Sequence, residues 1–168
     1  SSRYTYNAVG LPAKVSYLFE DGTAMENSFS YDAAGKMTGS QRSGSIAELL
    51  ADAAYTYDGA GRLLSYREGQ DTESYTYDAL GNRLTKKRNG IQTASYQYDG
   101  LNRLTGRTEN GGQYSYGYDK RGNLTEEKCG DDLIRQYVYD AAGRMRTGKN
   151  LESGEWTEYV YNVLGMRL

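Results

Sequence analysis

The chain has 168 residues, enough for one domain of ordinary size, and a formal net charge of -2 from 20 basic and 22 acidic residues. The basic residues are scattered rather than gathered on one face, which disfavours nucleic acid as a partner. The absence of histidine and the single cysteine exclude a histidine-based catalytic triad and an internal disulfide. No apolar run reaches the roughly 18 residues of a membrane-spanning helix, and no signal peptide is visible.

Tyrosine is the unusual feature of the composition. The chain has 18 Tyr and 21 Gly but one Pro and one Trp. Aromatic strands punctuated by glycine, with almost no helix signal, are typical of an all-β meander.

A short motif recurs eight times. It consists of two aromatic residues separated by one residue, then Asp or Asn, two variable residues, and Gly or Asn. Tyr75-Thr76-Tyr77-Asp78-Ala79-Leu80-Gly81 is a clear copy. The second aromatic, the Asp or Asn and the closing residue of copies 1 to 8 are Tyr6, Asn7, Gly10; Tyr31, Asp32, Gly35; Tyr57, Asp58, Gly61; Tyr77, Asp78, Gly81; Tyr98, Asp99, Asn102; Tyr118, Asp119, Gly122; Tyr139, Asp140, Gly143; and Tyr161, Asn162, Gly165. Self-similarity at a spacing of 20 to 26 residues predicts an array of stacked structural units.

Each copy reads as a strand, a tight turn and a return strand. Aromatic residues alternate with small polar ones in 74–77, as in a half-buried strand. Asp78 to Gly81 fits a type I turn with Asp first and Gly fourth. Asn102 replaces Gly in copy 5, and because Asn is the commonest non-glycine residue at positive φ, this position is predicted to be left-handed. Asn89-Gly90 is the strongest signal for the second, more variable turn between copies.

One insertion interrupts the spacing between copies 2 and 3. Ser45 followed by Glu48 forms a capping-box pattern, which predicts one or two helical turns near 45–53. A longer hairpin with a loose tip is the alternative.

Eight hairpins predict about sixteen strands, and sheets beyond about ten strands curl, split or close. The Tyr pairs and Leu63, Leu84, Leu104, Leu124 and Met145 would form a cross-strand ladder if they share a face, although Leu84 lies one residue further from its Tyr than Leu63 does. No amphipathic helix is long enough to cover such a face. The sheet is therefore expected to roll onto itself or to pair with another copy.

These residues resemble the YD repeat, also called the Rhs repeat, over essentially the whole chain. The clearest stretch is Tyr77-Asp78-Ala79-Leu80-Gly81-Asn82-Arg83-Leu84-Thr85. The resemblance implies a spiralling strip of hairpins that builds a hollow shell, as in bacterial Rhs toxins, the B and C components of insecticidal toxin complexes, and teneurins. The toxin shells enclose a C-terminal effector and cleave themselves at a junction rich in Asp, Pro and Gly. The chain has no Asp-Pro dipeptide, so we expect the wall alone.

Three features allow a functional interpretation beside a structural one. The Asp series could be catalytic or metal-binding, but one carboxylate per copy provides no convergent cluster, and a turn cap explains it better. The Tyr ladder could bind sugars, although cross-strand packing explains all copies. Cys129 lies beside Asp131 and Asp132, which disfavour a reactive thiolate.

The sequence therefore predicts one all-β array of antiparallel hairpins over residues 1–168, with incomplete first and last copies, as a fragment of a larger secreted or surface bacterial protein. We expect no enzyme activity, cofactor, metal or membrane span. The expected partners are flanking repeats, a second copy of the fragment, and an effector or a glycan. The alternative function is a carbohydrate-binding adhesion repeat.

Overall fold

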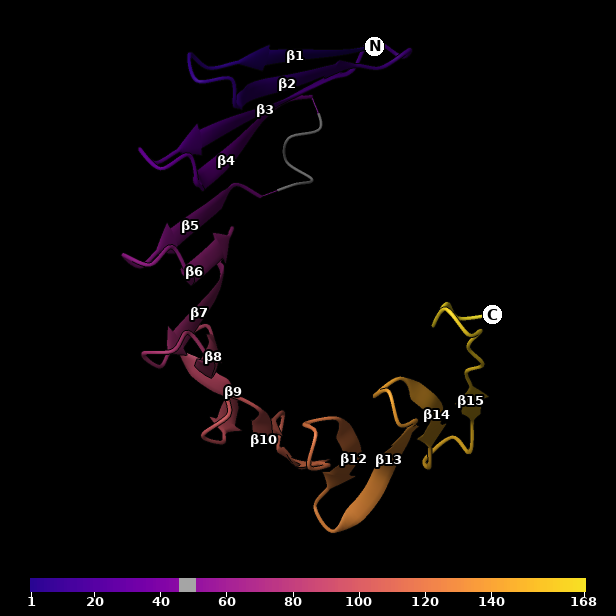
Figure 1. Ribbon diagram of the computed structural model, residues 1–168. Coiled ribbons are helices and arrows are strands. Elements are labelled where there is room, and N and C mark those ends of the chain that lie inside the picture. The colour runs from indigo at the N-terminus through magenta and orange to yellow at the C-terminus, as the bar shows by residue number, and fades with distance from the viewer. Residues whose placement is uncertain (46–50) are drawn as a thin grey trace. The chain divides into compact units, whose positions relative to one another are not determined.

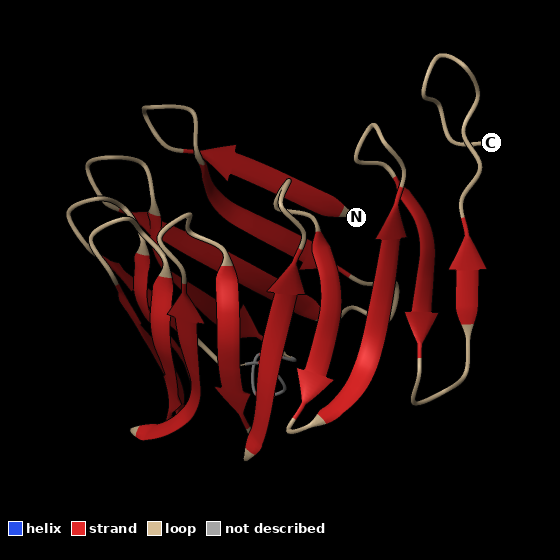
Figure 2. Ribbon diagram, turned by 60° about the horizontal axis from the view of Figure 1, so that its bottom comes forward, coloured by secondary structure: helices blue, strands red, loops and turns tan. Residues whose placement is uncertain are grey.

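The computed structural model describes residues 1–45 and 51–168, and these residues form strands and turns without a helix (Figures 1 and 2). The strands lie in the sheet in chain order, and every strand pairing recorded between them is antiparallel. The prediction of an all-β array of hairpins is confirmed. The strands are β1 (Ser2–Tyr6), β2 (Pro12–Leu18), β3 (Ala24–Tyr31), β4 (Met37–Gly44), β5 (Ala53–Tyr57), β6 (Leu63–Glu68), β7 (Asp71–Tyr77), β8 (Arg83–Arg88), β9 (Ile91–Tyr98), β10 (Leu104–Glu109), β11 (Gly112–Tyr118), β12 (Leu124–Cys129), β13 (Asp132–Tyr139), β14 (Met145–Asn150) and β15 (Trp156–Glu158).

The chain divides into two compact units. The first comprises Ser1–Thr76 and Lys86–Gln92, and the second comprises Tyr77–Thr85 and Thr93–Leu168. The same hairpin geometry is found in both.

The motif turn closes each hairpin by two backbone hydrogen bonds. In copy 5, the Asn102 N–H donates to the Asp99 carbonyl at 3.0 Å, and the Asp99 N–H donates to the Arg103 carbonyl at 3.0 Å. Asn102 has a φ of +61°. This is a type I turn followed by a left-handed residue, the arrangement that joins strands by a three-residue loop. The predicted left-handed conformation at Asn102 is confirmed.

The turns between copies use other geometry. Asn89 and Gly90 both have positive φ, at +50° and +80°, and Asn110 and Gly111 repeat this at +50° and +84°. Two successive left-handed residues define the type I′ turn, whose twist matches that of the flanking strands. The hairpin predicted at Asn89-Gly90 is confirmed.

Two details differ from the expectation. The structure has fifteen strands among the described residues rather than about sixteen, because the eighth copy closes by an isolated bridge between Tyr161 and Arg167. Of the helix predicted for 45–53, residues 46–50 lie outside the described residues. Ser45 is in a turn, where its N–H donates to the Ala24 carbonyl at 2.8 Å, and Ala53 already belongs to β5.

The buried core is thin. The buried apolar residues are Val15, Ala53, Ala94 and Ile134, and no described side chain is fully buried. The described strands belong to one sheet, so the burial within each unit comes mainly from neighbouring strands.

Candidate functional surface: the aromatic face and its turns

The second Tyr of a copy lies directly opposite an apolar residue on the return strand. The register pairs Tyr57 with Leu63, Tyr98 with Leu104, Tyr118 with Leu124, and Tyr139 with Met145. Directly paired residues project from the same side of a sheet. The predicted Tyr–Leu ladder is confirmed in these copies, and we call this side the aromatic face. The residues between the two tyrosines, Thr56, Gln97 and Val138, are exposed.

Leu84, which was expected in the ladder only on the condition that it shares the face, does not follow it. The Tyr98 hydroxyl donates to the Arg83 carbonyl at 3.1 Å, whereas the Tyr118 hydroxyl donates to the Leu104 carbonyl. Arg83 therefore takes the place of the ladder residue, since it stands six positions after its Tyr, as Leu63 does. Leu84 is one position further on and is 36% exposed.

Among the described residues, tyrosine hydroxyls link hairpins to the hairpin before them. The hydroxyl of the second Tyr donates to the backbone carbonyl of the ladder residue in the preceding copy. The pairs are Tyr31 to Pro12 at 2.7 Å, Tyr57 to Met37 at 2.8 Å, Tyr98 to Arg83 at 3.1 Å, Tyr118 to Leu104 at 2.8 Å and Tyr161 to Met145 at 2.9 Å. These bonds give the phenol oxygen a structural role.

The motif carboxylate is occupied by its own turn. In copy 5, Asp99 Oδ1 accepts the N–H groups of Leu101 at 2.9 Å and Arg103 at 3.0 Å, and Oδ2 accepts Arg103 Nε at 2.7 Å. Asp58, Asp78 and Asp140 accept the same three kinds of donor, and so does Asp119. The hydrogen bonds from Arg103 hold the pKa of Asp99 below its usual value, and the corresponding bonds lower the pKa of the other four. Asn7 and Asn162 keep the two backbone contacts.

The residue after the motif Gly or Asn reaches the next copy. We call it the post-turn residue. The Arg103 guanidinium lies 4.8 Å from the centre of the Tyr118 ring, and the Arg144 guanidinium lies 4.8 Å from that of Tyr161. Such a cation–π contact adds a modest attraction. One side chain thus joins the Asp of its own turn to the aromatic ring of the following hairpin.

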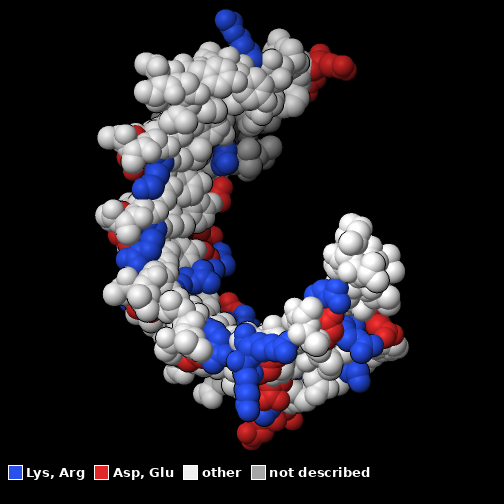
Figure 3. All heavy atoms as spheres, in the orientation of Figure 1, with Lys and Arg blue, Asp and Glu red and all other residues white. Residues whose placement is uncertain are grey.

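The aromatic face also carries charged groups that the sequence analysis missed. Glu127 is only 5% exposed and pairs with Arg135 at 2.9 Å, while Arg107 pairs with Glu109 at 2.8 Å. A buried carboxylate needs such a partner to remain charged. In the first unit, the Tyr66 hydroxyl donates to Glu68, which raises the pKa of Tyr66 to about 12. Acidic and basic side chains are interspersed on the side shown in Figure 3.

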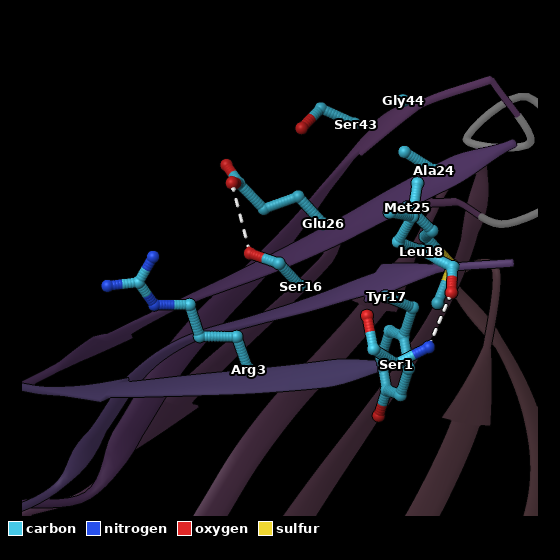
Figure 4. Close-up of a pocket in the computed structure, with 10 residues that line it drawn as sticks. All are labelled: Ser1, Arg3, Ser16, Tyr17, Leu18, Ala24, Met25, Glu26, Ser43 and Gly44. Atoms are coloured by element: carbon cyan, nitrogen blue, oxygen red, sulfur yellow. Dashed lines mark hydrogen bonds between the residues drawn. The ribbon is translucent and has the colours of Figure 1, made fainter. Parts of the chain in front are cut away.

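A concavity lies over β1 to β4, with a volume of about 390 Å³ (Figure 4). Arg3, Ser16, Glu26 and Ser43 form one directly paired row across these four strands. The Ser16 hydroxyl donates to Glu26 at 3.4 Å, and Lys14 pairs with Glu26 at 2.8 Å. The Glu26 carboxylate in this concavity is therefore already bound by Ser16 and Lys14 of the sheet.

The described residues offer no cluster of three or more His, Cys, Asp or Glu side chains that could hold a metal ion. Cys129 is a free, half-buried thiol on β12 opposite Tyr114. Within the described part of the chain, no helix is long and apolar enough to cross a membrane.

Comparison with known proteins gives the family. The model of the teneurin YD-shell matches residues 1–167. The chain belongs to this family. No curated protein matches the sequence of this YD-shell chain.

Solved structures share the fold. The crystal structure of TcdB2-TccC3-Cdc42 superposes with a TM-score of 0.66 at 17% identity, over 96% of this chain and 11% of that one. The crystal structure of TcdB2-TccC3 gives a TM-score of 0.64 at the same identity and coverage. The YD-shell chain therefore spans about a tenth of the length of these relatives.

Proposed function

We propose that this YD-shell chain is a non-enzymatic structural segment, a single array over residues 1–168 that forms part of the wall of a hollow β-shell in a larger protein. The observation that carries the proposal is how the motif is used. Its carboxylates accept hydrogen bonds within their own turns, and five of its phenol groups donate to the preceding hairpin. The repeated residues thus act in building the array, and catalysis would need a convergent cluster of free groups.

The wall would enclose a toxin or effector, or form a cell-surface scaffold, in a secreted or surface-exposed protein. Its direct partners would be flanking YD repeats, because the chain is short beside the solved proteins of the same fold. As an isolated fragment it would associate with a second copy through the aromatic face, which has no second layer in the described residues.

Carbohydrate binding is less well supported. Sugar stacking requires exposed rings, yet both motif tyrosines of copies 3 to 7 are half-buried by neighbouring strands. Titration of the chain with a panel of soluble oligosaccharides, followed by tyrosine fluorescence, is expected to give no saturable change.

Light scattering on a sizing column, with small-angle X-ray scattering of the same peak, tests the shell. We expect a dimer or larger assembly with a low-density centre. Leu104→Lys, on the aromatic face, should abolish association. Gln97→Lys is the matched control, because Gln97 projects from the opposite face and is exposed. A compact monomer of the unaltered chain, or equal effects of the two variants, would contradict the proposal.

A further inference from the structure

The turns of neighbouring hairpins touch one another, and glycine makes room for this contact. A Cβ atom added to Gly165 would lie 3.3 Å from Nη1 of Arg144, the post-turn residue of the preceding copy. A Cβ at Gly143 would lie 3.7 Å from Oδ1 of Asn123 in the same way. The closing position of the motif therefore meets two requirements: a left-handed backbone and space for the side chain of the preceding copy.

The contact between copies 4 and 5 departs from this arrangement at the closing position. Asn102 has a side chain where the neighbouring copies have Gly, and its Oδ1 accepts a hydrogen bond from Nδ2 of Asn82 at 3.0 Å. Asn82 is the post-turn residue of copy 4. Its Nδ2 also donates to Asp78 Oδ2 at 2.8 Å, so the two hydrogens of one amide link the two turns.

A longer post-turn residue would need the space that Asn102 fills. Arg103 and Arg144 extend past a glycine of the following copy and reach the rings of Tyr118 and Tyr161. An Arg at position 82 would have to pass the Asn102 side chain to make the equivalent contact with Tyr98. It would also remove the amide donor on which the Asn102 carboxamide depends.

We propose that Asn82 and Asn102 are a matched pair that specifies which hairpin packs after which. The post-turn residue of one copy and the closing residue of the next form a recognition contact. An Arg at the post-turn position requires Gly at the closing position of the next copy. An Asn at that closing position instead requires a short amide side chain at the post-turn position of the copy before it. This contact is made by the motif turns, and it joins each hairpin to the neighbouring hairpin of the same chain.

The same substitution at two equivalent positions tests the pairing. Asn82 and Asn123 make the same contacts with their own turns, through Nδ2 to Oδ2 of Asp78 or Asp119 at 2.8 Å. They differ in the closing residue of the next copy, which is Asn102 for Asn82 and Gly143 for Asn123. Asn82→Arg should lower the melting temperature by about 2–4 °C, the effect of a modest destabilisation in a chain of this length. Asn123→Arg should leave it within the error of the measurement.

The decisive variant is the double substitution Asn82→Arg with Asn102→Gly. It should recover most of the loss, although Asn102→Gly alone should not raise the melting temperature, because it removes the amide pair. Non-additivity in this cycle measures the coupling between the two sites. Circular dichroism establishes that each variant is folded. Equal losses for Asn82→Arg and Asn123→Arg, or strictly additive effects in the cycle, would overturn the proposal.

Discussion

Tyr118→Phe tests the link between neighbouring hairpins most directly. The change removes only the hydroxyl that donates to the Leu104 carbonyl at 2.8 Å, and it keeps the ring on the aromatic face. A net protein hydrogen bond contributes about 0.5–1.5 kcal/mol, and Tyr118 is half-buried, so we expect a loss of about 1 kcal/mol. For a chain of this length, that corresponds to a fall of about 2–4 °C in melting temperature. Thermal unfolding followed by circular dichroism measures it.

Tyr137→Phe is the matched control. Tyr137 is the first aromatic residue of copy 7 and is also half-buried, but among the described residues its hydroxyl has no hydrogen-bond partner. Tyr137→Phe should have the same melting temperature as the unaltered chain. If Tyr118→Phe were as stable as the unaltered chain, or if both variants lost the same amount, the hydroxyl link would not stabilise the array.

Three further outcomes are expected. Asp99→Asn should melt above Asp99→Ala, because Asn retains the Oδ1 acceptor, as Asn7 and Asn162 do; the reverse order would contradict the capping role. The free energy of unfolding should fall as the pH drops below 3.8, because the folded-state pKa of five motif aspartates is lowered. It should also fall as the pH rises from 10.0 to about 12, because the pKa of Tyr66 is raised. Denaturant titrations across both ranges measure this, and profiles that do not change with pH would argue against these hydrogen bonds. Gly81→Val should cost about 1–2 kcal/mol, since φ there is +94°, and Gly81→Asn should cost less; equal melting temperatures would refute the assigned turn.

The turns and strands could be predicted because their causes lie within a few residues. Asp at the first position, a left-handed residue at the fourth and alternation before them determine each hairpin locally, and Asn102 even revealed the backbone conformation. Leu84 was placed in the ladder only on the condition that it shares the face, and its extra residue of distance from Tyr77 was the signal that it does not. Position after the motif, not hydrophobicity, decides which residue accepts the Tyr98 hydroxyl.

The charged groups on the aromatic face could not be predicted in the same way. Glu127 meets Arg135 through the register set by the turns between copies, whereas Tyr66 with Glu68 and Arg107 with Glu109 are pairs two residues apart on one strand. Those turns vary in length and sequence, so the pairing across them is not encoded in the motif. The pairing of the buried Glu127 with Arg135 depends on this longer-range alignment.

The contacts between hairpins have a direction. A phenol hydroxyl reaches back toward the N-terminal neighbour, while a post-turn guanidinium reaches forward to the C-terminal one. During synthesis, a newly emerging hairpin would therefore find its acceptor carbonyl and its cation already in place on the hairpin before it. Such contacts would let each hairpin dock on the one synthesised before it, in N- to C-terminal order.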